Sequence, residues 1–226
     1  MGFERRFDEG YAEAIPLEFG PGVRGRRSSQ FDFAAKRVLD FVLAFILLTA
    51  LAPLLALVAV AIRLDSPGPV LFRQTRLGIN GRPFNILKFR TMTVLENGHR
   101  IVQARSNDPR VTRVGRFLRK TSIDELPQLT NVLKGEMSLA GPRPHARAHD
   151  EYYAAQIDNY VRRQAMKPGI TGWAQVNGFR GETPTLDCMR RRVDCDLWYV
   201  DHFNIALDLE IFVRTVFQIL RQRNVH

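Results

Sequence analysis

The chain has 226 residues, 45% of them hydrophobic, which is enough for one substantial domain with its own core and some appended segments. Its formal net charge is +10, and such a surface favours anionic partners: nucleic acid, phosphorylated small molecules or an anionic membrane. The two cysteines, Cys188 and Cys195, are too few for a disulfide framework or a zinc site, and they suit a reducing compartment.

The N-terminal part divides into a tail and a membrane element. Residues 1–30 mix charges with Gly and Pro without periodicity, so we expect a flexible polar tail. Residues 31–65 contain the uncharged run "FVLAFILLTALAPLLALVAVAI", which is long enough to cross a bilayer as a helix. Its length and the absence of a small-residue cleavage pattern exclude a cleavable signal peptide.

The topology of this run is open from the residues alone. Basic residues flank both of its ends, and cationic flanks normally stay on the cytoplasmic side. Pro53, near the middle, removes one backbone hydrogen bond. The alternatives are a spanning helix, a hairpin broken at Pro53 that returns to the same side, and a fully buried core helix.

Two strands and a turn follow a loop at residues 65–69. The segments "VLFRQTRLG" and "RPFNILKFRTM" have strand character, and Asn80-Gly81 between them is a hairpin signal. Lys88 and Arg90 on the second strand are two residues apart and so share a face. They are either a solvated edge or a pair of phosphate ligands.

A basic helix and an acidic pair come next. The segment "RVTRVGRFLRK" predicts an amphipathic helix with an arginine stripe. Ser122 to Glu125 then reads as a capping box. Pro127 restricts the start of the next helix to about Asp124, which places the Asp124 and Glu125 carboxylates at the positive end of that helix.

The remaining segments carry further motifs. The rigid turn "AGPRPHAR" places Arg143 between two prolines, and "KPGITGWAQVNGFRGE" predicts a glycine-rich loop. We expect helices in "EYYAAQIDNYVRRQAM" and, wholly or in part, in "LDCMRRRVDCDLWYVDHF". Residues 208–226 predict a basic amphipathic helix whose apolar face contacts either a membrane surface or the domain's own core.

These pieces point to phosphate chemistry. Arginine is the preferred bidentate ligand of phosphate. Several arginines around Asp124 and Glu125 suggest that a divalent cation, Mg²⁺ or alternatively Mn²⁺, joins both carboxylates to substrate phosphate oxygens. This indicates phosphoryl transfer on a diphosphate substrate, in which an aspartate can also attack phosphorus directly.

The sequence resembles a known family, the bacterial sugar transferases, or monotopic phosphoglycosyl transferases. The resemblance covers roughly residues 36–216, and the matching motifs occur in family order: "KRVLDF", "SPGPVLFRQTRLG", "FNILKFRTM", "DPRVTRVGRFLRKTSIDELPQLTNVLKGEMSLAGPRP", "KPGITGWAQVNG" and "DLWYVDHFNIALDLEIFVRTV". It implies transfer of a sugar-1-phosphate from a UDP-sugar to undecaprenyl phosphate, with release of UMP. The implied product initiates exopolysaccharide or other glycan assembly.

The resemblance also assigns roles to residues. Asp124 matches the nucleophile that forms a covalent phosphosugar intermediate, and Glu125 matches the acid that assists it. The other positions marked by the family pattern are phosphate contacts and one supporting acid: Arg119, Arg143 and Lys88 for phosphate, and Asp196 as the acid.

The implied fold is α/β (α+β): a small, mostly helical catalytic domain with a short β-hairpin. Residues 31–65 would be a re-entrant hairpin broken at Pro53 with both ends cytoplasmic, residues 66–207 a cytosolic catalytic domain, and residues 208–226 an interfacial helix. Ala52 departs from the serine that small family members often have before the proline. The implied location is the cytoplasmic face of a bacterial inner membrane.

Within the family, "GFRGETPTLDCMRRRVDCDLWYVDHF" is similar to the exopolysaccharide-initiating branch, which implies glucose or galactose as the sugar. Membrane lipid, downstream glycosyltransferases and a second copy of the chain are the other expected partners; nucleic acid is not. The sequence leaves the sugar and the oligomeric state open.

Two alternatives without catalysis fit the sequence less well. A membrane-tethered nucleic-acid-binding protein would use the charge and the basic helix, but the chain shows no recognisable binding motif and its basic residues cluster around acids. A scaffold protein of the polysaccharide machinery would typically have lost the acidic pair, and both Asp124 and Glu125 are present.

Overall fold

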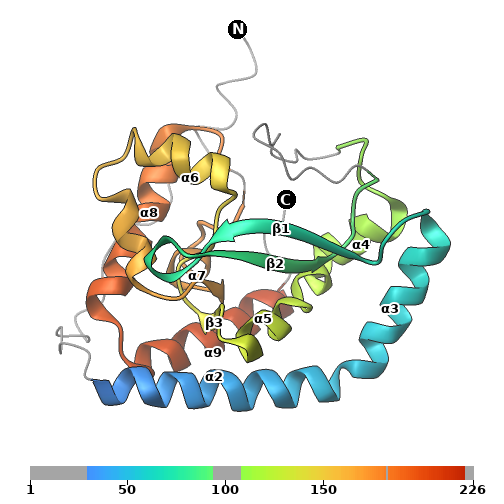
Figure 1. Ribbon diagram of the computed structural model, residues 1–226, viewed down its shortest axis with the longest axis horizontal. Coiled ribbons are helices and arrows are strands. Elements are labelled where there is room, and N and C mark those ends of the chain that lie inside the picture. Colours follow the sequence, from blue (N-terminus) through green and yellow to red (C-terminus); the bar gives the residue numbers. More distant parts are fainter. Residues whose placement is uncertain (1–29, 94–107, 182, 222–226) are drawn as a thin grey trace, which may run out of the picture.

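The computed structural model describes residues 30–93, 108–181 and 183–221, so residues 1–29 of the predicted tail and the last residues of the predicted helix 208–226 lie outside the described residues. The described part is mostly helical with two small sheets (Figure 1). In chain order the elements are α2 (Gln30–Ala50), α3 (Ala52–Asp65), β1 (Leu71–Leu77), η1 (Ile79–Gly81), β2 (Pro83–Phe89), α4 (Arg113–Thr121), η2 (Ile123–Glu125), α5 (Gln128–Lys134), β3 (Ser138–Ala140), α6 (Arg147–Ala154), η3 (Tyr160–Ala165), β4 (Gly169–Thr171), α7 (Trp173–Val176), α8 (Leu186–His202) and α9 (Ile205–Arg221), where η marks a 3₁₀ helix.

The apolar run forms two helices joined by a bend. Helices α2 and α3 meet at Leu51 with an angle of 61°, and Pro53 lies in the first turn of α3. Neither of these helices, nor any other described one, has the length and apolar character to span a membrane alone, whereas the bent pair together does. Large apolar side chains such as Phe45 and Leu57 are exposed along both, so the alternative of a fully buried core helix is wrong.

Helix α2 is fixed to the rest of the domain by buried polar contacts. It packs along α5, β3 and α9 (Figure 1). The Lys36 ammonium donates to the Ala140 carbonyl at 2.9 Å and pairs with Asp208 of α9 at 2.5 Å. The Asp40 carboxylate accepts the Leu139 amide at 2.9 Å. Helix α2, the first half of the bent apolar pair, is therefore also part of the scaffold that holds β3.

The predicted β-hairpin is confirmed. Strands β1 and β2 pair antiparallel, with Leu77 opposite Pro83. The connection is a short 3₁₀ turn in which Asn80 and Gly81 have positive φ angles of 55° and 71°, the conformation that Asn and Gly tolerate best. Phe84 and Ile86 of β2 point into a core cluster with α5, which sets the side of the sheet that faces the domain.

The glycine-rich segment does not form only a loop, as the sequence had suggested. It contains β4, which pairs in parallel with β3, followed by the short helix α7. The two backbones approach so closely at Gly169 that a Cβ there would lie 2.2 Å from the Gly141 nitrogen. The segment 151–166, expected to be helical, is divided between the end of α6 and η3 by an irregular stretch ending at Asn159, whose φ is 60°.

Helices α8 and α9 close the second core cluster, which contains Tyr199, Phe203 and Trp173. Leu207 and Ile211 of α9 are buried there. The apolar face that the sequence singles out is instead exposed along α9, as Leu209, Val213, Val216 and Phe217 show. One side of α9 therefore packs on the core, and another side exposes apolar side chains at the surface of the domain.

Candidate active site

The acidic pair lies in a tight turn between two helices. Asp124 and Glu125 belong to η2, between α4 and α5. Ser122 takes a left-handed conformation (φ 59°) that ends α4, and its hydroxyl accepts a hydrogen bond from Arg180 at 2.6 Å. The predicted capping box is therefore wrong, because Ser122 terminates one helix and does not cap the next, and α5 begins only after Pro127.

Glu125 is held by two cations from distant segments. Lys88 of β2 contacts Oε1 at 2.8 Å, and Arg143, from the loop after β3, contacts Oε1 at 2.5 Å and Oε2 at 3.2 Å. Burial opposes ionisation, but Arg143 and Lys88 hold the pKa of the Glu125 carboxyl well below its usual value. Glu125 is thus charged near neutral pH and orients the two cations.

Asp124 has a different environment. Its side chain is partly buried and makes no hydrogen bond or ion pair to another residue in the described ranges. Burial and then the charge of Glu125 raise the pKa of the Asp124 carboxyl to about 6, against the opposing effect of Lys88, Arg143 and Arg119. Near neutral pH this carboxylate is mostly ionised and is not occupied by donors, which suits a nucleophile.

Two further arginines complete the cationic surroundings. Arg119, in the last turn of α4, lies close enough to lower the pKa of Asp124, and its guanidinium points towards Met92 Sδ at 3.7 Å. Arg180, after α7, interacts electrostatically with Glu125 and Asp124, and burial lowers its pKa. Sequence analysis missed Arg180, although it lies in the segment "NGFRGE" that carries the family resemblance.

Arg90 does not join this cluster. It is buried, and its guanidinium donates to the carbonyls of Ser66 at 2.6 Å and Pro67 at 2.9 Å, just beyond the end of α3. Strand β2 ends at Phe89, so Arg90 lies outside the regular strand. The alternation of side chains between the two faces of the strand therefore does not place Arg90 on the same face as Lys88. We therefore correct the prediction that Arg90 binds substrate phosphate: its donors serve the connection between α3 and β1.

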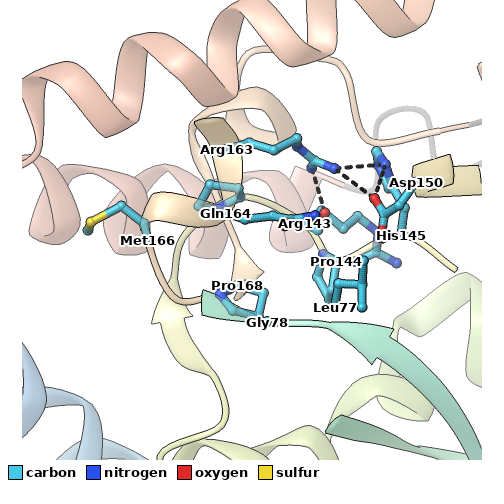
Figure 2. A pocket seen from close by; sticks show the side chains of 11 residues that line it. Leu77, Gly78, Arg143, Pro144, His145, Asp150, Arg163, Gln164, Met166 and Pro168 are labelled. Atoms are coloured by element: carbon cyan, nitrogen blue, oxygen red, sulfur yellow. Dashed lines mark hydrogen bonds and ion pairs between the residues drawn. The ribbon is translucent and has the colours of Figure 1, made fainter. Parts of the chain in front are cut away.

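Asp196 reaches the site only through another residue. It is buried in α8 and pairs with Arg163 of η3 at 2.6 Å. Arg163 in turn donates to the Arg143 carbonyl at 2.6 Å (Figure 2). Asp196 is thus linked to Arg143 through Arg163 and does not contact Asp124 in this arrangement, and its role as a supporting acid stays a prediction.

The donor set limits how a metal ion could bind. The described residues contain no group of three or more His, Cys, Asp or Glu side chains that could hold an ion. The adjacent carboxylates of Asp124 and Glu125 fit Mg²⁺, which commonly takes one or two carboxylates and completes its shell with water and substrate phosphate oxygens. Asp124 is the freer of the two, because both oxygens of Glu125 already accept from cations.

Comparisons with known proteins bear on what this site does. The family model described as "Bacterial sugar transferase" matches residues 31–222. The chain is 56% identical over 191 residues to a UDP-glucose:undecaprenyl-phosphate glucose-1-phosphate transferase of Caulobacter vibrioides, covering 84% of the chain and 72% of that protein. It is 54% identical over 183 residues to the protein of the same name in Escherichia coli, covering 81% of the chain and 39% of that protein.

A third relative is of similar size to the chain. The exopolysaccharide production protein PSS of Rhizobium leguminosarum is 47% identical over 189 residues, covering 82% of the chain and 94% of that protein. The chain spans only about two-fifths of the length of several other curated relatives, the Escherichia coli protein among them. Because the family model covers most of the chain and the relatives are about half identical to it, the chain belongs to the bacterial sugar transferase family.

Proposed function

We propose that this chain transfers a hexose-1-phosphate from a UDP-sugar to undecaprenyl phosphate and releases UMP. The observation that carries the proposal is the unoccupied carboxylate of Asp124, surrounded by cations from four separate segments: Lys88, Arg119, Arg143 and Arg180. A diphosphate bound in this site would lie next to the Asp124 carboxylate, and the four cations would neutralise the charge of its phosphates. The names of the relatives support the same donor and acceptor.

The reaction proceeds in two displacements at one phosphorus atom. A carboxylate oxygen of Asp124 attacks the sugar-bearing phosphorus, the bond from that phosphorus to the bridging oxygen breaks, and UMP leaves with that oxygen. The phosphosugar is then attached to Asp124 as an acyl phosphate. An oxygen of the lipid phosphate attacks the same phosphorus and releases Asp124 as a carboxylate, so one hard step is divided into two.

Glu125 and its cations organise the substrate. Glu125 holds Lys88 and Arg143 in fixed positions, so their remaining N–H donors are oriented before the diphosphate binds. Donors oriented in this way stabilise the negative charge that develops on the phosphate oxygens in the transition state. Mg²⁺, or Mn²⁺ in its place, would be held by Asp124 and Glu125 and would neutralise phosphate charge when bound.

The donor sugar in this proposal is glucose. The support is that relatives about 50–56% identical to the chain carry UDP-glucose in their names. A relative from Aeromonas hydrophila, 43% identical, is named for N-acetylgalactosamine, so the sugar differs between members of the family. The name of the Rhizobium leguminosarum relative favours exopolysaccharide assembly as the pathway that uses the product, with downstream glycosyltransferases as its consumers.

The bent pair α2–α3 would be a re-entrant hairpin, entering and leaving the cytoplasmic leaflet of the inner membrane. Support comes from the bend at Leu51, the exposed apolar side chains of both helices and the basic residues at both ends. The exposed apolar side of α9 would contact the same membrane surface. This arrangement brings the lipid acceptor to the catalytic domain without a spanning helix.

The test measures UMP release by purified protein with undecaprenyl phosphate and Mg²⁺. The donors are UDP-glucose, UDP-galactose and UDP-N-acetylgalactosamine. We expect sustained release over many turnovers that depends on the acceptor, is fastest with UDP-glucose, and is lost in Asp124→Asn and on adding EDTA. If none of the three donors gives UMP release, or if Asp124→Asn releases UMP at the wild-type rate, the proposal is contradicted.

A further inference from the structure

Arg163 lies where four segments of the catalytic domain meet. It comes from η3 and is only 4% exposed. Around it are Asp196 of α8, Asp150 of α6, and the loop between β3 and α6 that contains Arg143 and His145. Figure 2 shows its guanidinium pointing at this loop, towards Arg143 on one side and towards His145 and Asp150 on the other.

The guanidinium of Arg163 uses all of its hydrogen-bonding capacity. A guanidinium has five N–H donors in a fixed planar fork. Nε and Nη2 donate to Asp196 Oδ2 at 3.1 and 2.6 Å. The second Nη2 donor goes to the Arg143 carbonyl at 2.6 Å. Nη1 donates to His145 Nδ1 at 2.8 Å and to the Tyr160 hydroxyl at 3.1 Å. A lysine, with one nitrogen, cannot satisfy these acceptors together.

His145 gives the same loop a second anchor. Because a guanidinium can only donate, Nδ1 of His145 accepts from Arg163, and this contact favours the neutral form of the ring. This agrees with burial and then the charge of Arg163, which lower the pKa of His145 well below its usual value. One guanidinium therefore holds the loop at Arg143, through the backbone, and at His145, through the side chain.

The loop between β3 and α6 is anchored on both sides of Arg143, because the Gly169 N–H donates to the Pro142 carbonyl at 3.0 Å and Arg76 forms a β-bridge with Ala146. Pro142 and Pro144 flank Arg143 and contribute no N–H donors. The side chain of Arg143 extends to Glu125, while its carbonyl accepts from Arg163. The Arg163 guanidinium, which does not contact the carboxylate pair itself, therefore acts on Glu125 through the backbone of Arg143.

We propose that Arg163, fixed by Asp196, is a positioning residue for phosphosugar transfer: it sets the backbone of Arg143 so that the Arg143 guanidinium meets Glu125 and the substrate diphosphate. The inference rests on the proposed function. Stability alone is a weak reason for this buried ion pair, because apolar residues of similar volume often stabilise a protein equally well. The acceptors of Arg163 on the Arg143 loop supply the functional reason.

Arg163→Lys tests the role without leaving Asp196 unpaired. The lysine keeps the charge next to Asp196 but loses the fork, so the protein should fold while the Arg143 loop loosens. We expect kcat/KM to fall by about 10-fold to 100-fold, with a higher KM for the UDP-sugar as well as a lower kcat, because small misplacements of a substrate-orienting group have effects of this size. The matched control is Arg162→Lys. Arg162 is the residue before Arg163, and its exposed guanidinium pairs with Asp201.

A double-mutant cycle separates positioning from simple destabilisation. If Arg163 acts through Arg143, then adding Arg163→Lys to Arg143→Met should lower kcat/KM by less than about 2-fold. A purely structural role would remove folded enzyme by the same factor in both backgrounds and leave KM unchanged. That result, or wild-type kinetics in Arg163→Lys, would overturn the inference.

Amide hydrogen exchange tests the positioning role without an activity measurement. Arg163→Lys should accelerate exchange at the amides of Arg143, His145 and Ala146 relative to the wild type, while Arg162→Lys should not. Unchanged exchange in this loop overturns the positioning role even if the protein is active. Absence of UMP release by the wild type would instead overturn the proposed function, and the exchange result would then decide the structural part alone.

Discussion

Replacing Asp124, the proposed nucleophile, should make the protein more stable. Burial and the charge of Glu125 raise the pKa of Asp124 from 3.8 to about 6 in the folded protein, which disfavours the charged form by about 3 kcal/mol. Asp124→Asn removes this charge with little change of shape. Because the side chain is only partly buried, we expect a gain of about 1–2 kcal/mol at pH 7.5, or about 2–8 °C in apparent Tm.

The pH dependence of stability tests a second time whether ionised Asp124 destabilises the folded protein. The folded pKa of Asp124 lies above its unfolded value, so between about pH 4 and 6 the folded state takes up a proton, and the free energy of unfolding of the wild type falls as pH rises through this window. The asparagine variant does not titrate. Its advantage should therefore be full at pH 7.5, about half as large at pH 5, and absent well below pH 4.

The assay is thermal unfolding in detergent with EDTA, at one scan rate, at pH 5 and at pH 7.5. Asp158→Asn, at an exposed position, is the control and should change the free energy of unfolding by less than about 0.5 kcal/mol. Glu125→Gln should act in the opposite direction and lower the Tm, because it leaves Lys88 and Arg143 without their partner. A lower Tm for Asp124→Asn at pH 7.5, or a difference that is the same at both pH values, refutes this reasoning.

Three further predictions follow from contacts elsewhere in the fold. Lys36→Met leaves the buried carboxylate of Asp208 unpaired, so the free energy of unfolding in urea should fall by about 3–5 kcal/mol; a loss below about 1 kcal/mol would show that the pair is not buried in solution. Gly169→Ala places a Cβ 2.2 Å from a backbone nitrogen, so this variant should lose at least about 2 kcal/mol by the same measurement, and a neutral result would mean that the β3–β4 pairing is looser than described. Pro53→Ala restores a backbone donor near the bend, so a cysteine introduced at Gln30 should become labelled from the periplasmic side only in this variant; labelling in the Pro53 background would contradict the re-entrant hairpin.

Local sequence signals predicted the parts of the fold that depend on a few neighbouring residues. Asn80-Gly81 identified the β-hairpin because these two residues tolerate the positive φ angles that the turn requires. The break in the apolar run could be anticipated because Pro53 lacks an amide donor, and the structure places the bend two residues earlier, at Leu51. The adjacency of Asp124 and Glu125 was a property of the sequence itself.

Features that depend on contacts between distant segments could not be predicted in this way. Arg180 reaches the carboxylate pair, and Arg163 reaches the Arg143 loop, only because β3 and β4 pair and bring segments some 20 to 60 residues apart together. The same limit explains the error at Arg90: spacing gave it the same strand face as Lys88, but the strand ended first and tertiary contacts with Ser66 and Pro67 decided its direction.

The most direct test of the central claim is mass spectrometry of the protein incubated with UDP-glucose and Mg²⁺ in the absence of acceptor. The account predicts a hexose-phosphate adduct on the peptide that contains Asp124, formed together with UMP, absent in Asp124→Asn, and removed when undecaprenyl phosphate is added. Acceptor-dependent UMP release with no adduct, or with an adduct on another residue, would contradict Asp124 as the nucleophile.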